Sequence, residues 1–173
     1  MGYPSSVVHD KLKNMLNWHR LFGIGLIDLF TGTNYTVELE RDLSLKQQFL
    51  DVIIIEQTEG EPPTHLPEGL EPLAKHNLLT YKSLRESLDS WAIDELIGHY
   101  VNYRKQISEE LLPVEDFRLY AVCTRFPHKL AKEVALREQQ AGVYDVQWGV
   151  HQIRILVLNQ FTNSETNAFW QLF

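Results

Sequence analysis

The stretch FLDVIIIE at residues 49–56 decides how the rest of the chain is interpreted. Its run of valine and isoleucine after Asp51 is typical of a strand buried on both faces. A polar, proline-rich segment follows, and a second apolar stretch, HNLLTYKS, occupies residues 76–83. If the two strands pair, Asp51 near the start of one faces Lys82 near the end of the other. That arrangement suits a divalent metal with a lysine beside it, and it also suits a plain structural ion pair.

Apolar periodicity predicts the elements around these two strands. We expect helices at 9–30, 84–106, 128–139 and 164–173, and further strands at 35–41, 117–126, 143–148 and 153–160. Ser83 or Ser87 is the expected N-cap of the long helix at 84–106. Residues 57–75 are too polar and too rich in proline for a helix, so we expect a long surface loop there. Together these elements predict an α/β fold with a mixed central β-sheet flanked by helices.

Composition limits the class of protein. A chain of 173 residues suits one domain, residues 1–173, with a sizeable core. The net charge of −7 counts against a protein that coats DNA, since phosphate contacts require basic surfaces. The single cysteine, Cys123, excludes an internal disulfide and a cysteine zinc cluster. We expect neither a signal peptide nor a membrane span, and therefore a cytoplasmic location.

An acid on one strand, followed by acid-x-Lys on the next and then a long amphipathic helix, is the pattern of a known superfamily. The chain resembles the PD-(D/E)XK, or restriction-endonuclease-like, nucleases over roughly residues 15–125. The resemblance is closest to uncharacterised bacterial members of the recombination-promoting nuclease or transposase-like kind. It implies a restriction-endonuclease-like fold, with Asp51 as the first metal ligand and Lys82 as the motif lysine. The sequence departs from the motif at Thr80, where an acid is expected.

The resemblance implies Mg²⁺ or Mn²⁺ as the cofactor, because these hard cations take oxygen ligands. Asp51 and Glu40 are the candidate metal ligands, and Glu40 would stand in for the acid missing at Thr80. Glu38 shares a strand face with Glu40 and is the alternative ligand. Thr80 itself offers only a neutral hydroxyl, and Lys82 would orient the attacking water.

Three further side chains lie on predicted helices. His99 and Tyr103 are one turn apart on the long helix, where related nucleases often add a polar residue, so both are candidate substrate-binding residues. The alternative is that His99 packs on an aromatic ring of the helix face, and we expect the same of His19 on the first helix. The seven histidines show no spacing typical of a zinc site.

Two hypotheses about function follow. The first is a magnesium-dependent endonuclease that hydrolyses phosphodiesters, with DNA as the expected partner. The second is an inactive nuclease fold that acts as an interaction module, with a protein partner or a second copy of itself. The missing acid at Thr80 and the acidic composition favour the second hypothesis, whereas the pairing of Asp51 with Lys82 favours the first.

Overall fold

The stretch at residues 49–56 forms a strand inside a seven-stranded sheet. The computed structural model describes residues 5–42, 49–57 and 59–173, with the backbone alone for residues 5–17, 40–42 and 49–50. The helices and strands, in chain order, are α1 (Ser5–Phe30), β1 (Tyr35–Asp42), β2 (Phe49–Glu56), β3 (His76–Lys82), α2 (Ser90–Gln106), β4 (Phe117–Cys123), α3 (Leu130–Glu133), β5 (Leu136–Gln140), β6 (Val143–Trp148) and β7 (His151–Val157). Short 3₁₀ helices follow at Val114–Asp116, Leu158–Gln160, Glu165–Asn167 and Trp170–Leu172. The predicted α/β class, a mixed sheet flanked by helices, is confirmed.

The strand order is β1-β2-β3-β4-β7-β6-β5. The first three strands are antiparallel, β3 is parallel to β4, and β4 is parallel to β7. The parallel step from β3 to β4 needs a crossover, and α2 supplies it. β2 and β3 therefore lie inside the sheet, which agrees with their apolar sequences.

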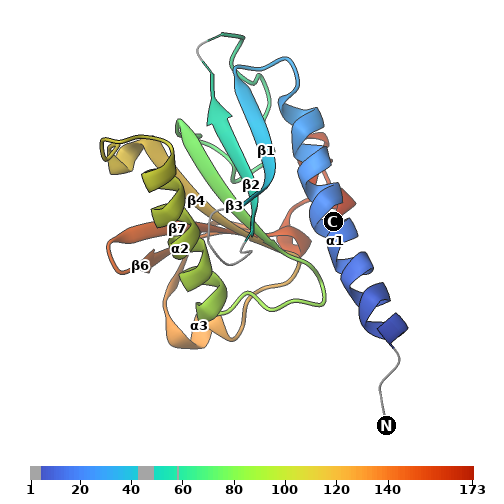
Figure 1. Ribbon diagram of the computed structural model, residues 1–173. Helices are drawn as coiled ribbons and strands as arrows, with labels where there is room; N and C mark the ends of the chain where they lie inside the picture. The colour runs from blue at the N-terminus through green and yellow to red at the C-terminus, as the bar shows by residue number, and fades with distance from the viewer. Residues whose placement is uncertain (1–4, 43–48, 58) are drawn as a thin grey trace.

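The two long helices cover opposite faces of the sheet (Figure 1). On one face α1 buries Phe22, Leu26 and Phe30 against the sheet, and on the other face α2 buries Ile93 and Leu96. Alternation along β2 divides its side chains between these two cores, with Val52 and Ile54 towards α1 and Ile53 towards α2. By the same alternation, the Asp51 side chain leaves β2 on the side of the sheet that α2 covers.

Glycine explains how closely α1 approaches β1. A Cβ atom on Gly23 would lie 2.4 Å from a methyl carbon of Leu39. The sequence suggests that Gly23 and Gly25 break or kink the first helix, yet α1 continues through both to Phe30. Gly23 thus provides space for packing, since a larger side chain at this position would displace the side chain of Leu39.

The structure corrects three of the expected elements. The long helix begins at Ser90, where Asp89 is the N-cap and its carboxylate accepts a hydrogen bond from the Ala92 amide at 3.1 Å. Neither Ser83 nor Ser87 is its cap. The helix expected at 128–139 is shortened to Leu130–Glu133, and Leu136–Gln140 is an edge strand. The helix expected at 164–173 consists of separate 3₁₀ turns.

The connection between β2 and β3 has no helix and no regular strand among its described residues, as expected for a long loop. Its chain returns to the body of the protein, because Leu70 is fully buried in the α1-side core. In the ranges that the structure describes, no helix has both the length and the apolarity that a membrane span requires.

Candidate functional site

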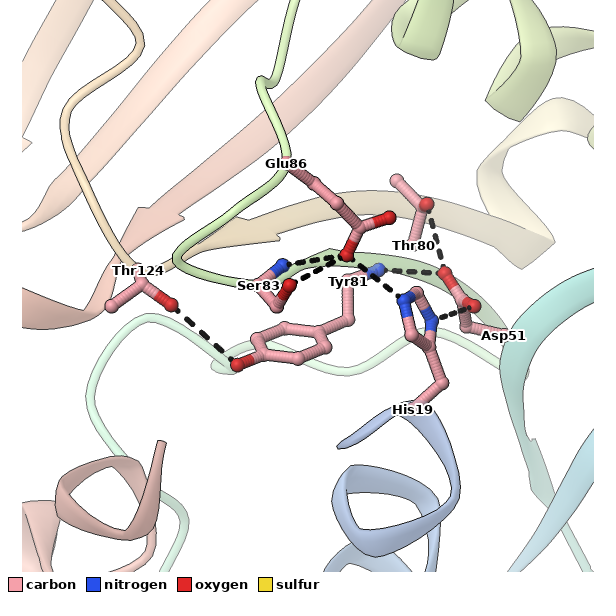
Figure 2. Close-up of polar contacts among 7 residues, drawn as sticks. All are labelled: His19, Asp51, Thr80, Tyr81, Ser83, Glu86 and Thr124. Atoms are coloured by element: carbon pink, nitrogen blue, oxygen red, sulfur yellow. Dashed lines mark hydrogen bonds and ion pairs between the residues drawn. The ribbon is translucent and has the colours of Figure 1, made fainter. Parts of the chain in front are cut away.

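The polar side chains gather where β2 and β3 separate. The backbone pairing of these strands runs from Ile55–His76 to Val52–Leu79 and stops there. The next position would place Asp51 opposite Thr80, so Asp51 is the first residue beyond the ladder. Its carboxylate lies in the opening between the two strands, among the residues drawn in Figure 2.

Asp51 accepts three hydrogen bonds. Its Oδ2 accepts one from the Thr80 hydroxyl at 3.0 Å and one from the Tyr81 backbone amide at 2.8 Å. The amide bond replaces the ladder partner that Tyr81 loses when the strands separate. The other oxygen, Oδ1, lies 2.5 Å from Nδ1 of His19. Both carboxylate oxygens of Asp51 therefore have partners within the protein.

His19 joins two carboxylates that are far apart in sequence. Its Nδ1 faces Asp51, and its Nε2 lies 3.1 Å from Oε2 of Glu86. The same Glu86 oxygen accepts hydrogen bonds from the Ser83 amide at 3.1 Å and from the Ser83 hydroxyl at 2.8 Å (Figure 2). We call His19, Asp51 and Glu86 the imidazolium cluster, and it ties α1 to β2 and to the loop before α2.

The packing around His19 fixes the orientation of its ring. The ring meets that of Tyr81 edge to face, with centroids 5.6 Å apart, and Tyr81 in turn stacks on Phe22 at 4.6 Å. The Tyr81 hydroxyl reaches the Thr124 hydroxyl at 3.5 Å. Aromatic contacts thus hold the His19 ring in the plane that presents one nitrogen to each carboxylate.

Charge keeps the His19 ring protonated. Burial lowers its pKa, but hydrogen bonds to Asp51 and Glu86 and their negative charges together raise the pKa to about 10. For Glu86, burial raises the pKa, while His19 and the two Ser83 donors lower it to about 2. An imidazole with carboxylates at both nitrogens must carry two protons to satisfy them, so the cluster contains an imidazolium at neutral pH.

Lys82 and His99 lie on the same side of the sheet as Asp51. Thr80 and Lys82 follow the α2-facing Leu78 at alternate positions of β3. Burial lowers the pKa of His99 and the charge of Lys82 lowers it further, whereas Glu95 and Asp51 raise it. His99 is therefore within electrostatic reach of both Asp51 and Lys82.

One other predicted residue, Tyr103, lies away from Asp51. Tyr103 is fully buried near the opposite end of β3, where its hydroxyl lies 2.9 Å from Nδ1 of His76, so it is not brought to Asp51.

The backbone register places Glu40 opposite Asp51, because Leu39 pairs with Val52 and Arg41 with Leu50. The side chain of Glu40 lies outside the described residues. Glu38 pairs with Ile53, two positions farther along β2.

The described part of the expected ligand set is already engaged within the protein. Both carboxylate oxygens of Asp51 and the Oε2 of Glu86 accept hydrogen bonds from protein groups, so a magnesium ion would have to compete with those donors. The Thr80 hydroxyl is itself a donor to Asp51. Over the described parts of the chain, no group of three or more histidine, cysteine, aspartate or glutamate residues is arranged to hold a metal ion.

General base chemistry is equally poorly matched to this geometry. A histidine that acts as a general base needs a free nitrogen lone pair and a pKa near the operating pH. Both nitrogens of His19 are directed at carboxylates, and the pKa of His19 is about 10. Ser83 donates its hydroxyl to Glu86 rather than to a histidine, so no serine nucleophile is activated here. What the cluster does is hold one cation between two carboxylates and connect three segments of the chain.

Asp51 and Thr80, both predicted from the sequence, contact each other, but the sequence analysis did not predict the cation. We expected His19 to be a packing residue, and it does contact Tyr81, but its main partners are Asp51 and Glu86. One signal was available: His19 lies three and seven positions before Phe22 and Leu26, on the inward face of α1. A titratable side chain on that face needs a partner. Glu86 was missed because residues 84–89 were assigned to a helix.

Known proteins give no independent assignment for this chain. Comparison with protein-family models, with curated proteins and with solved structures finds no match.

Proposed function

We propose that this chain is a restriction-endonuclease-like domain in which an internal imidazolium has replaced the catalytic metal, and that it acts as a protein-interaction module. Support for the fold comes from the order of elements: a helix, three antiparallel strands, a crossover helix and a parallel strand. The acid and the lysine of the motif fall on neighbouring strands at the point where those strands separate. Fold alone does not determine activity, so the activity depends on the residues of the site.

The observation that carries the proposal is the position of His19 between Asp51 and Glu86. Two carboxylates that face the same site attract a cation, and in a metal nuclease a divalent ion fills that role. Here the cation is a side chain of the protein itself. A metal ion would have to displace the imidazolium from Asp51, against a pKa of about 10 that reflects how strongly the two acids hold it.

The overall charge supports a protein partner over a nucleic acid. The net charge of −7 repels phosphates at long range, and the cluster adds no positive excess because one imidazolium faces two carboxylates. Lys82 is the predicted phosphate-contacting residue, and its charge acts on His99 together with the opposite charge of Asp51. This distribution gives little affinity for a DNA backbone.

A second candidate function, metal-dependent phosphodiester hydrolysis, is favoured by one specific observation. The Thr80 hydroxyl contacts Asp51, and Lys82 follows Thr80 two positions later on β3, which is the spacing between the second acid and the lysine of the nuclease motif. For catalysis His19 would have to release Asp51, and a further acid would have to supply the ligand that Thr80 cannot provide.

Calorimetric titration with Mn²⁺ separates the two candidates. We expect no binding to the wild-type protein at millimolar Mn²⁺, and no metal-dependent cleavage of plasmid or single-stranded DNA. The double variant His19→Ala, Thr80→Glu removes the imidazolium and restores the missing acid, and we expect it to gain Mn²⁺ binding.

A matched control is Asp116→Ala, which removes a carboxylate that pairs with Lys75 away from the cluster and leaves Mn²⁺ behaviour unchanged. The proposal fails if the wild type binds Mn²⁺, loses that binding in Asp51→Ala, and cleaves DNA with the metal. In that event the metal-dependent nuclease is the correct function.

A further inference from the structure

The outer face of α1 carries an unusual concentration of exposed apolar side chains. Four of the eleven exposed large hydrophobic residues in the described part of the chain lie on this helix, within ten positions: Trp18, Leu21, Ile24 and Ile27. Their exposed fractions are 48%, 51%, 40% and 39%. A large apolar group that collects on one element marks an interaction surface, whereas single exposed residues need no explanation.

Helix geometry places five residues on one stripe centred on Ile24. At about 100° per residue, Arg20 and Asp28 lie about 40° to either side of Ile24, and Leu21 and Ile27 about 60° to either side. All five are exposed. The buried Phe22 and Leu26 lie on the opposite side of the helix, against the sheet. We call Arg20, Leu21, Ile24, Ile27 and Asp28 the α1 stripe.

The α1 stripe is self-complementary about Ile24. An antiparallel pairing of two copies of α1, related by a two-fold axis at Ile24, puts residue 24 + k at the same height as residue 24 − k of the other copy. Ile24 then meets Ile24 once, on the axis itself, while Leu21 is level with Ile27 and Arg20 with Asp28, each of these pairs occurring twice. This reciprocity is what a two-fold symmetric interface requires.

The charges single out a second copy as the occupant. Arg20 and Asp28 form no ion pair with any residue that the structure describes, so each is available to an external partner. They have opposite sign and equal spacing from the centre of the stripe. In the antiparallel pair both are neutralised, whereas a parallel pair would place like charges together.

We propose that the protein forms a homodimer through the α1 stripe, with two α1 helices packed antiparallel about Ile24. The surface is on the opposite side of α1 from the buried core residues Phe22 and Leu26, and the proposal does not depend on whether the imidazolium cluster is catalytic. An antiparallel helix pair alone buries a modest area, so the dimer is expected to dissociate reversibly on dilution.

Sedimentation velocity over a dilution series, on the full chain, tests the dimer. The wild type is expected to show a concentration-dependent monomer–dimer equilibrium. Ile24→Arg places two arginines together on the two-fold axis and is expected to give a monomer. The matched control Val101→Arg changes a residue of α2 with a similar exposed fraction, 38%, and is expected to leave the equilibrium unchanged.

Charge reversal provides the decisive comparison. Arg20→Glu and Asp28→Arg each create two like-charge contacts, and each is expected to raise the dissociation constant about tenfold or more. The double variant Arg20→Glu, Asp28→Arg restores both pairs in swapped order and is expected to recover the wild-type constant. The proposal is overturned by a wild type that stays monomeric at every concentration, or by a double variant no tighter than the single ones. Circular dichroism of each variant establishes that it is folded.

Discussion

Two histidines near opposite ends of β3 have pKa values shifted in opposite directions. His19 lies where β2 and β3 separate, and the carboxylates of Asp51 and Glu86 raise its pKa to about 10 despite its burial. His76, the first residue of β3, has its pKa lowered by burial, with Lys75 lowering it further and Asp116 raising it. The hydrogen-bond partner of its Nδ1 is the neutral hydroxyl of Tyr103, and its ring stacks on Phe117 at 5.0 Å.

The difference shows that the partners of a partly buried histidine decide its charge. Burial acts in the same direction on both rings, because low dielectric surroundings disfavour the charged form. Only His19 has an acid at each nitrogen, and these acids overcome the burial. One residue type therefore acts as an internal cation at one end of the strand and as a neutral packing side chain at the other.

The largest expected effect comes from removing each ring in turn. His19→Leu leaves Asp51 and Glu86 partly buried without their cation, and we expect it to lower the free energy of unfolding by about 3 kcal/mol. His76→Leu loses a neutral hydrogen bond and a ring contact, and we expect a loss of about 1 kcal/mol. Urea unfolding followed by tryptophan fluorescence measures both.

Adding Asp51→Asn to the His19→Leu variant sharpens this result. The double variant removes one of the two uncompensated carboxylates, so we expect it to be less unstable than the sum of the two single variants, with a coupling of about 1–2 kcal/mol. Equal losses for His19→Leu and His76→Leu, or simple additivity of His19→Leu with Asp51→Asn, would contradict the distinction between the two ends of β3.

The second prediction concerns pH. The folded pKa of His19, about 10, is above the unfolded value of 6.5, so its stabilisation is complete below pH 6.5 and is lost as the pH rises towards 10. The folded pKa of His76 is below 6.5, so its contribution has the opposite sign, and stability falls as the pH drops below that value.

The measurement is the difference in unfolding free energy between the wild type and each leucine variant, recorded from pH 5 to 10. For His19→Leu we expect the difference to shrink by about 2 kcal/mol towards alkaline pH, since the cluster is partly exposed to solvent. For His76→Leu we expect a smaller change, confined to the acidic side. A difference for His19→Leu that does not change above pH 7 would rule out the imidazolium.

A small effect is expected for Ser83→Ala. Ser83 donates two hydrogen bonds to Oε2 of Glu86, and the substitution removes only the hydroxyl donor at 2.8 Å. We expect a loss of about 1 kcal/mol in unfolding free energy. Ser87→Ala, at an exposed position of the same loop, is the matched control and is expected to have almost no effect. A loss as large as that of His19→Leu would mean that Ser83, not His19, organises Glu86.

Much of the fold was predictable because the inner strands have continuous apolar sequences. The runs in β2, β3 and β4 indicate buried strands without any tertiary information. β5 was assigned to a helix because its sequence, LREQQ, has no apolar alternation, and as an edge strand it is mostly exposed. Strand formation there is determined by pairing with β6, which a local pattern cannot reveal.

The candidate site was predictable only along the two strands. The sequence suggests that Asp51 faces Lys82 across the strand pair, but the register places Thr80 opposite Asp51. His19 could not be placed with them, since nothing in the sequence states where α1 crosses the sheet. Glu86 depends in addition on a short loop that looks helical in composition. The residues that set the charge of the site therefore come from segments joined only by tertiary packing.

The pKa of His19 tests the central claim most directly. Imidazole resonances of His19, assigned by their loss in His19→Leu, can be followed by heteronuclear NMR as the pH is raised. If His19 is the cation held between Asp51 and Glu86, its ring stays doubly protonated through neutral pH and titrates near pH 10. Titration at or below the ordinary histidine value of 6.5 would show a neutral ring, and the internal cation would be contradicted.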